Sequence, residues 1–160
     1  MSRLSQEARN FISLIRESTC TSVLTGAGIS VASGIPDFRS PGGLYSKISP
    51  DIFELSSFIE DPARYYRVAK ERIHTMSDVS PNATHILLTR LQTLGLIETI
   101  ITQNIDGLQQ KSGAEEVVEL HGTVSKFECM QCKKRFTRKE VELLLERSDV
   151  PRCDCGGLIK

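Results

Sequence analysis

The chain has 160 residues, and its 20 Lys and Arg side chains are balanced by 20 Asp and Glu side chains, so the formal net charge is zero. This length predicts one domain with room for a small satellite module. The neutral balance excludes a protein-wide field that attracts nucleic acid or an anionic membrane, so we expect neither partner unless charge gathers in a local patch.

The first predicted element is an amphipathic helix near the N-terminus. Ser5 is a suitable N-cap, and Ala8, Phe11, Ile12 and Ile15 recur at helical spacing. We expect this helix to pack on a sheet. The segment has neither the apolar core of a signal peptide nor a run long enough to cross a membrane, which predicts a cytoplasmic protein, or a nuclear one in a eukaryote.

A short buried strand is predicted over residues 20–25, with Cys20 as a small buried residue rather than a reactive thiol. The glycine turn Gly26-Ala27-Gly28 follows, and a helix is expected from Ile29 onward. Such a turn lets backbone N–H groups approach a pyrophosphate closely. The third glycine of the dehydrogenase pattern G-x-G-x-x-G is absent, so the turn alone is equally compatible with a tight connection that binds nothing.

The loop after this turn carries a carboxylate, an aromatic ring and a guanidinium at Asp37, Phe38 and Arg39. Three such groups directly after a candidate phosphate turn favour a ligand site over a bare connection. Asp37 can also cap its own loop, and the two roles are compatible.

Helices are predicted between residues 46 and 95, because start signals stand at Ser49-Pro50, Asp61-Pro62 and Ser80-Pro81. The second helix carries an apolar stripe that we interpret as core. The stripe comprises Tyr66, Ala69, Ile73 and Met76. The third helix ends near Gly95 and contains His85, which we interpret as a packed histidine satisfied by a neighbour.

Two further strands are predicted, at residues 98–102 and 117–120, so the order of elements is typical of a parallel α/β sheet. Gln103-Asn104-Ile105-Asp106 follows the first of them, and His121 follows the second. Ligands of such sheets bind at the carboxyl ends of the strands. The sequence therefore predicts one pocket shared by the glycine turn, residues 103–106 and His121.

Two close pairs of cysteines near the end of the chain predict a metal site in a reducing compartment rather than disulfides. The ligands are Cys129, Cys132, Cys153 and Cys155. Four thiolates leave no open position, so we expect one structural zinc ion that holds together the residues from about 125 onward. The ribbon is basic, at Lys133, Lys134, Arg135, Arg138 and Lys139, but it has little aromatic interleaving. This pattern favours a solvated surface over a nucleic-acid site.

Three motifs together resemble the signatures of the sirtuins, the NAD-dependent protein deacylases. GAGISVASGIPDFRSPGGLY resembles their cofactor loop, and TQNIDG and HG resemble the other two signatures, in the same order. The resemblance implies a partial doubly wound, parallel, Rossmann-like α/β sheet with an inserted zinc-ribbon module. Residues 1–124 would form the NAD-binding part, with a helical insertion at about 46–95, and residues 125–160 the ribbon.

The resemblance also implies roles for individual residues. The implied NAD contacts are Gly26, Ala27, Gly28, Ser30, Asp37, Phe38, Arg39, Gln103, Asn104, Ile105 and Asp106. Among these, Gln103 and Asn104 would contact the nicotinamide ribose, and the Asp106 carboxylate would bind the nicotinamide amide. His121 would be the general base that acts on a ribose hydroxyl, so His121 and Asn104 are the implied catalytic residues.

The implied reaction removes an acyl group from a protein lysine and yields nicotinamide, an O-acyl-ADP-ribose and free lysine. The implied partner is an acylated-lysine protein or peptide. Relatives that accept negatively charged acyl groups use a Tyr-x-x-Arg pair after the cofactor loop. Here Tyr45 is followed three residues later by Ile48, which favours an apolar acyl group such as acetyl.

Sirtuins continue beyond their ribbon. We therefore expect residues 1–160 alone to lack the adenosine side of the pocket, to be inactive, and to leave the strand at 20–25 as an exposed edge. Two other functions stay open: a non-enzymatic zinc-ribbon binding module that retains a residual cofactor half, and a mono-ADP-ribosyltransferase that uses the same pocket. The intact motifs argue against the binding module with a residual cofactor half, because little except cofactor-dependent function requires all of them.

Overall fold

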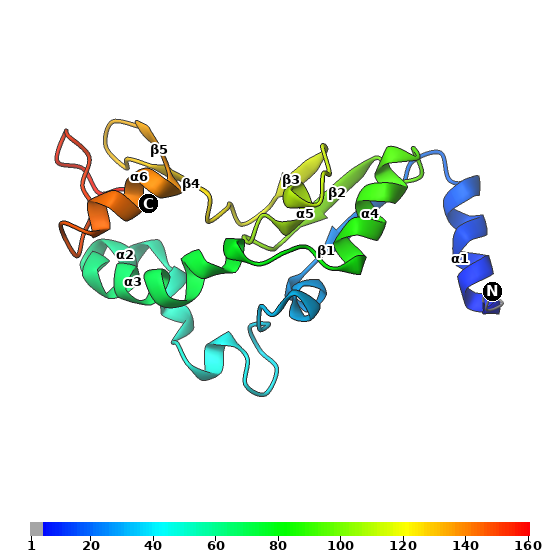
Figure 1. Cartoon of the computed structure of the whole chain (residues 1–160), viewed down its shortest axis with the longest axis horizontal. Coiled ribbons are helices and arrows are strands. Elements are labelled where there is room, and N and C mark those ends of the chain that lie inside the picture. The colour runs from blue at the N-terminus through cyan, green and yellow to red at the C-terminus, as the bar shows by residue number, and fades with distance from the viewer. Residues whose placement is uncertain (1–4) are drawn as a thin grey trace.

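The computed structural model describes residues 5–160 and has three parts along its length, as Figure 1 shows. Helix α1 (Gln6–Glu17) lies at one end, the larger sheet in the middle, and helices α2 and α3 with the cysteine-rich ribbon at the other end. Residues 1–4, part of the segment in which we expect no signal peptide, lie outside the described residues. In the range 5–160, no helix has both the length and the apolar character needed to cross a membrane.

The central sheet confirms the predicted fold class. It consists of β1 (Ser22–Thr25), β2 (Thr99–Thr102) and β3 (Val117–Glu119), all parallel, in the order β1-β2-β3. Ile100 of the middle strand is fully buried and packs with Ile97 and Ala114 below helix α4 (Ala83–Thr93). Because the strands are parallel, their carboxyl ends meet at one edge of the sheet, as the sequence predicted.

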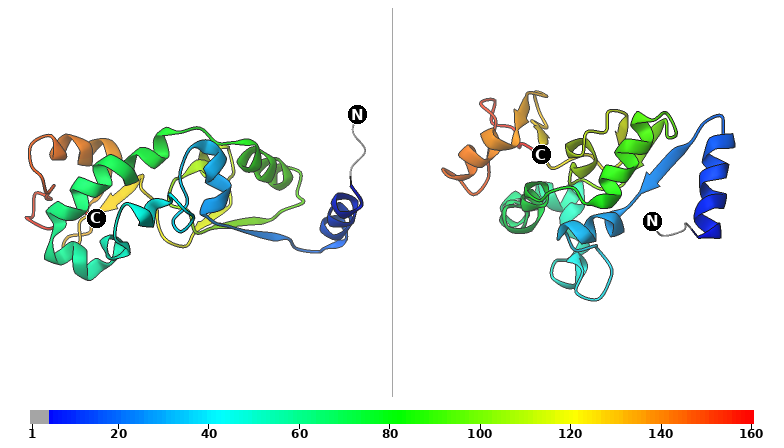
Figure 2. Two further views of the ribbon diagram at one scale, coloured as in Figure 1. Left: turned by 90° about the horizontal axis from the view of Figure 1, so that it is seen from below. Right: turned by 45° about the vertical axis from the view of Figure 1, so that its right-hand side comes forward.

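Helix α1 forms where it was predicted but does not pack on the sheet. The Ser5 hydroxyl accepts a hydrogen bond from the Ala8 N–H over 3.2 Å, which is the expected N-cap. No residue of α1 is buried, and Phe11 is 60% exposed. Figure 2 shows the helix standing apart, joined to β1 by an extended segment. The predicted packing is wrong, because the helix lies beyond the edge strand and its apolar stripe meets no core among the described residues.

Cys20 also departs from prediction. It is exposed and precedes β1, and its thiol donates a hydrogen bond to Glu98 Oε2 over 2.9 Å. That carboxylate raises the pKa of the thiol and keeps it protonated. The prediction of a buried strand residue is wrong because the strand begins two positions later, at Ser22.

The glycine turn leads into a 3-10 helix, η1 (Ala27–Ser33), rather than the α-helix expected from Ile29. Gly26 precedes it in extended conformation, and Gly34 ends it with φ of 93°. Glycine, serine and β-branched residues within this run have low α-helix propensity, which favours the short, tighter helix. Gly34 has a left-handed backbone conformation, which residues with a side chain rarely adopt.

The segment between the loop and β2 consists of short helical pieces separated by brief non-helical connections. They are η2 (Leu44–Ser46), η3 (Pro50–Phe53), α2 (Leu55–Glu60), α3 (Pro62–Val68), the π-helical turn η4 (Ala69–Ile73), η5 (His74–Asp78) and α4. Asp61 caps α3 as predicted, but the cap of α4 is Asn82 rather than Ser80. Gly95 follows the end of α4 with φ of 69°, as expected. The predicted stripe from Tyr66 to Met76 is confirmed as core.

His85 is a packed histidine, as predicted. It is 1% exposed, and its Nδ1 accepts a hydrogen bond from the Asn82 N–H over 3.3 Å. Its Nε2 is buried and has no hydrogen-bond partner among residues 5–160.

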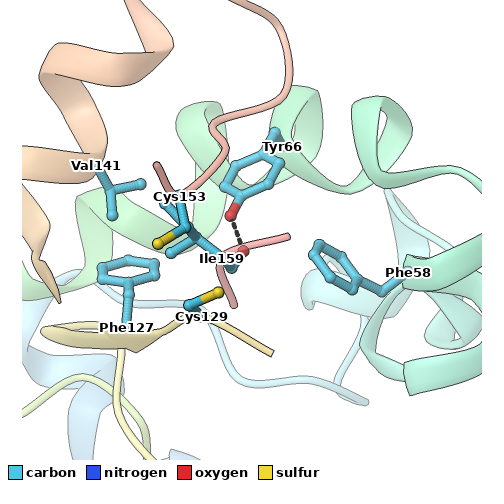
Figure 3. Packing of buried hydrophobic residues seen from close by; sticks show 7 residues of the cluster. All are labelled: Phe58, Tyr66, Phe127, Cys129, Val141, Cys153 and Ile159. Atoms are coloured by element: carbon cyan, nitrogen blue, oxygen red, sulfur yellow. Dashed lines mark hydrogen bonds between the residues drawn. The ribbon is translucent and has the colours of Figure 1, made fainter. Parts of the chain in front are cut away.

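The ribbon pairs β4 (Lys126–Glu128) with β5 (Arg135–Thr137) in an antiparallel ladder, followed by α6 (Arg138–Leu145). Its core continues into the helical segment, as Figure 3 shows. The shared cluster contains Phe58 and Tyr66 from the helices, and Phe127, Cys129, Val141, Cys153 and Ile159 from the ribbon. The Tyr66 hydroxyl donates to the carbonyl oxygen of Ile159. Two of the four cysteines are therefore part of a hydrophobic core that joins the ribbon to the helices.

Candidate functional site

A cavity of about 930 Å³ lies between the carboxyl edge of the sheet and the ribbon. The sheet side contributes Ala27, Asp37, Phe38, Arg39, Gln103, Asn104, Ile105 and His121 to its wall. The opposite side contributes Tyr65, His74, Lys126, Phe127 and Lys160. The predicted convergence of the glycine turn, residues 103–106 and His121 at one edge is therefore present in the structure.

Four of the predicted cofactor residues lie outside this cavity. Ser30 and Asp106 line a narrow adjoining recess of about 10 Å³, which shares Ala27, Phe38, Asn104 and Ile105 with the main cavity. Gly26 and Gly28 line neither space. A Cβ at Gly28 would meet no atom within 4 Å, so the backbone at Gly28 borders open space.

A buried polar network joins the glycine turn to the loop after β2. The Asn104 Nδ2 donates to the Ser30 hydroxyl over 3.1 Å and to the Gly26 carbonyl oxygen over 3.2 Å. Ser30 in turn donates to Asp106 Oδ2 over 2.7 Å, and the Leu108 N–H donates to Asp106 Oδ1 over 2.9 Å. Each of these three side chains is at most 7% exposed. Four hydrogen bonds thus fix the Asn104 amide and the Asp106 carboxylate relative to the turn.

His121 lies on the exposed rim of the cavity, and its tautomer follows from its contacts. Nδ1 lies 3.0 Å from the carbonyl oxygen of Gln103. A carbonyl oxygen only accepts hydrogen bonds, so Nδ1 carries a proton, and in the neutral ring the lone pair is then on Nε2. The ring is therefore held in the form in which Nε2 can accept a proton.

The loop that carries Asp37 is closed by that side chain. Asp37 accepts hydrogen bonds from the Ser40 N–H over 2.8 Å and from the Ser40 hydroxyl over 2.5 Å. The Ser40 hydroxyl lowers the pKa of Asp37, so the carboxylate is charged at neutral pH. The loop cap that the sequence suggested is thus present, and it turns Phe38 toward Tyr45 and Phe53, with ring centroids 5.3 and 5.9 Å away.

Sequence reasoning did not assign the far wall to the site, and Tyr65, His74 and Lys160 are its notable members. Tyr65 precedes the stripe that was predicted as core, His74 falls within it, and Lys160 belongs to the ribbon. The Lys160 ammonium lies 4.3 Å from the centre of the Phe58 ring and 4.8 Å from that of Tyr65, and burial lowers its pKa. Only the alternation of apolar and polar residues around position 66 could have indicated Tyr65. Nothing local indicated the other two, because their contacts cross between modules.

The four predicted cysteine ligands form one cluster. Their sulfurs all lie within 4.8 Å of one another, and the pairs Cys129–Cys155 and Cys132–Cys153 are 3.5 Å apart. Zinc with thiolates at about 2.3 Å places its sulfurs about 3.8 Å apart, so the cluster fits a tetrahedral zinc ion. The Cys132 N–H donates to Cys129 Sγ and lowers the pKa of the Cys129 thiol to about 6, which favours the thiolate that a metal requires. The backbone hydrogen bond at Lys134 lowers the pKa of Cys132, but the three neighbouring sulfurs outweigh it and raise that pKa to about 12, so a bound metal would have to displace the Cys132 proton.

Gly157 is part of this metal site although it offers no ligand. A Cβ at this position would lie 2.7 Å from Cys129 Sγ and 2.9 Å from the Cβ of Gln131. The second cysteine pair is C-x-C, so the chain must turn back immediately after Cys155. Gly156, with φ of 85°, makes that turn, and the missing side chain at Gly157 lets the backbone pass the sulfur.

The chain is similar to proteins of known family. The Sir2 family model matches residues 26–160. A protein from Thermotoga maritima named NAD-dependent protein deacetylase is 49% identical over 153 residues, which are 95% of this chain and 62% of that protein. One of the same name from Saccharolobus solfataricus is 44% identical over 144 residues, 89% of this chain and 58% of the relative.

Solved structures agree in fold. A Sir2 described with a p53 peptide and NAD+ superimposes with a TM-score of 0.88 at 47% identity, covering 95% of this chain and 61% of that one. A Sir2 bound to a propionylated peptide gives a TM-score of 0.86 at 46% identity, covering 97% and 62%. The chain thus spans about 60% of the length of the relatives it matches.

Proposed function

The chain belongs to the Sir2 family, and we propose that it carries the nicotinamide side and the zinc ribbon of an NAD-dependent protein deacetylase. The observation that carries the proposal is that Asn104 and His121, from the ends of neighbouring strands, share one cavity of about 930 Å³. A volume of this order suits a ligand of cofactor size together with an extended side chain.

The residues present fit NAD. Nicotinamide has a carboxamide NH₂ that needs an acceptor. Within residues 5–160, Asp106 Oδ1 accepts one hydrogen bond from Leu108 and Oδ2 accepts one from Ser30, so each oxygen keeps a lone pair for a ligand. The adjoining recess is smaller than a pyridine ring, so we expect the loop at Phe38 to shift when the ring enters. The open space beside the backbone at Gly28 leaves room for a phosphate. Gln103 and Arg39, at the cavity wall, would contact the nicotinamide ribose and the phosphates.

When bound, NAD would supply an electrophilic ribose carbon: the acyl oxygen of the acyl-lysine would bond to it as the bond to nicotinamide breaks, and one water molecule would be consumed in freeing the lysine. The products would be nicotinamide, an O-acyl-ADP-ribose and free lysine. In this proposal, His121 accepts a proton from a ribose hydroxyl at Nε2, while its Nδ1–H stays bound to the Gln103 carbonyl. Asn104 orients the ribose with an amide that Ser30 and Gly26 hold in place. Phe38 covers the sugar and excludes water after nicotinamide leaves.

We propose an acetylated lysine in a protein or peptide as the substrate. On the wall opposite the sheet, Tyr65, Phe127 and His74 offer mainly aromatic surface for a lysine stem and a short acyl group. We further propose that residues 1–124 bind the cofactor, and that the insertion at about 46–95 and the ribbon at 125–160 form the substrate wall. A cytoplasmic location fits the four reduced thiols of the metal site.

The test measures nicotinamide release and lysine deacetylation with NAD and an acetyl-lysine peptide. It uses residues 1–160 and a chimera in which they are joined to the part of the Thermotoga maritima relative beyond the match. We expect turnover from the chimera and none from residues 1–160 alone, because within the described residues β1 is an edge strand with Leu24 63% exposed.

Peptide binding is measured alongside this assay. Two outcomes would contradict the proposed function, and a third would contradict only the expectation that residues 1–160 alone are inactive. ADP-ribose transfer to the peptide without deacetylation would indicate a mono-ADP-ribosyltransferase. Peptide binding without NAD consumption would indicate a non-enzymatic binding module. Turnover by residues 1–160 alone would refute the expectation that they are inactive.

A further inference from the structure

The N-terminus of α4 contacts the glycine turn from outside the cavity. Asn82 Nδ2 donates to the carbonyl oxygen of Ile29 over 2.7 Å and to the hydroxyl of Ser33 over 2.9 Å. Asn82 lines neither the main cavity nor the recess. The side chain of Asn82 therefore contacts the site indirectly, through η1.

Helix η1 needs such support. It is a 3-10 helix, whose hydrogen bonds are poorer than those of an α-helix, and no side chain caps its N-terminus. With three residues per turn, Ser30 and Ser33 lie on the same face. Asn82 holds Ser33, and one turn earlier Ser30 holds Asn104 and Asp106. A rotation of η1 that broke the outer contact would also displace the inner one.

The same end of α4 supports the loop on the other side of the site. Gln109 Nε2 donates to the carbonyl oxygen of His85 over 3.2 Å, and Gln109 belongs to α5 (Leu108–Lys111), which starts directly after the Asp106 loop. His85 Nδ1 accepts the N–H of Asn82. The first turn of α4 thus contacts both η1 and α5, the elements that flank the recess.

We propose that Asn82 is a positioning residue for cofactor binding: by holding η1, it sets the distance between the glycine turn and the Asn104–Asp106 loop. This inference rests on the proposed function, because the ligand concerned is NAD. The residue also has a separate structural task, since its Oδ1 accepts the Thr84 N–H and caps α4. The experiment must separate the contacts of Asn82 with Ile29 and Ser33, called the clamp below, from its capping of α4.

Two substitutions keep the cap and remove the clamp. Ser and Asp cap helices about as well as Asn, but the serine side chain is too short to reach Ile29, and aspartate has no donor to offer it. We expect Asn82→Ser to weaken NAD binding about tenfold, which corresponds to a glycine turn that holds its binding geometry about one-tenth of the time. Asn82→Asp should weaken it further, because a carboxylate would then face a carbonyl oxygen.

Binding is measured by calorimetry on the chimera, with the unfolding midpoint and the peptide affinity recorded for each variant. Hydrogen exchange of the amides in residues 27–35 gives a readout independent of activity, and it should be faster in both variants. The matched control is Thr137→Ser, a conservative change at the N-cap of α6, which should leave NAD affinity and exchange at 27–35 unchanged.

The outcomes separate the two proposals. If the wild-type chimera binds no NAD, the proposed function fails and the positioning role fails with it. If the wild type binds NAD and both Asn82 variants bind it equally well, only the positioning role is refuted. A loss of NAD affinity matched by an equal loss of stability and of peptide affinity would show that Asn82 is merely a cap, and would overturn the inference.

Discussion

The Ser30 hydroxyl is bound on both sides: it donates to Asp106 Oδ2 over 2.7 Å and accepts from Asn104 Nδ2 over 3.1 Å. A single hydroxyl thus links two residues that are proposed to contact opposite sides of the nicotinamide–ribose bond. Ser30 is 1% exposed, so water cannot readily take its place.

Ser30→Ala should therefore lower the free energy of unfolding by about 1–3 kcal/mol, because it leaves a buried amide and a buried carboxylate with one partner fewer. It should also weaken NAD binding by the chimera, since both groups become free to turn. Denaturant unfolding and calorimetric titration measure the two effects. Ser46→Ala is the control, because it removes a hydroxyl that, within residues 5–160, donates to the Gly43 carbonyl oxygen and joins no second side chain. Equal effects of the two substitutions would argue against the bridging role.

His121→Ala in the chimera should reduce deacetylation by a factor of about 10²–10⁴, the usual contribution of a general base. The side chain is exposed, so the unfolding midpoint and the affinity for zinc should not change. A nicotinamide-release assay at saturating NAD and peptide measures the loss. Turnover close to that of the wild type would remove the proton-accepting role from His121.

One zinc ion per chain should be bound through Cys129, Cys132, Cys153 and Cys155, which elemental analysis of protein purified without chelator can count. Cys129→Ser should abolish binding and loosen more than the ribbon, because Cys129 packs in the same cluster as Phe58 and Tyr66. Exchange of amides in α2 and α3 should therefore accelerate. The control is Cys20→Ser, which removes an exposed thiol far from the cluster. Loss of zinc in Cys20→Ser, or full retention of zinc in Cys129→Ser, would contradict the assignment.

The stability of the protein should fall as the pH drops below about 6.5, in part because of His74. Burial lowers the pKa of this ring, nearby Arg138 lowers it further, and Glu142 and Asp78 oppose the shift. The folded protein then binds fewer protons than the unfolded chain. The contribution of neutral His74 to stability is complete at a pH above the pKa of His74 in the unfolded chain. It is lost as the pH falls through the lower pKa that His74 has in the folded protein.

His74→Phe should remove this component and keep the edge contact with Phe127, whose ring centroid lies 5.4 Å away. Denaturant unfolding at about pH 7.5 and about pH 5.5 should show a smaller loss of stability in the variant. Protonation of the zinc ligands affects both proteins equally and cancels in the difference. Identical pH dependence would show that His74 titrates alike in the folded and unfolded states.

The sequence predicted those features of the fold that depend on local pattern. A few neighbouring residues are enough to predict each of four features: the strand end at Thr102, the strand end near His121, the glycine turn and the four cysteines. The parallel topology of the sheet then brings the loops after the strands to one edge. The helix cap was misplaced from Asn82 to Ser80 because Ser-Pro is a strong start signal. Asn82 is the cap in the structure: its side chain accepts the Thr84 N–H and also donates to the carbonyl oxygen of Ile29, 53 residues away.

Features that depend on packing between distant segments could not be predicted from local sequence patterns. Periodicity predicted α1 correctly, but an apolar stripe does not say which surface, if any, will cover it, and here Phe11 is exposed. The roles of Ser30 and Lys160 likewise come from partners in other modules. The assignment of individual residues to cofactor contacts stays a prediction until binding is measured.

The absence of a side chain at Gly157 limits how this ribbon can diverge. Even an added methyl group at this position would lie 2.7 Å from Cys129 Sγ. In a saturation library at position 157, we expect selection for metal retention to return glycine almost alone, while neighbouring Leu158 tolerates other apolar residues. One extra residue between Cys153 and Cys155 would lengthen the turn and could relax that requirement. In evolutionary terms, the short cysteine spacing and Gly157 should be inherited as a pair, so that neither changes without the other.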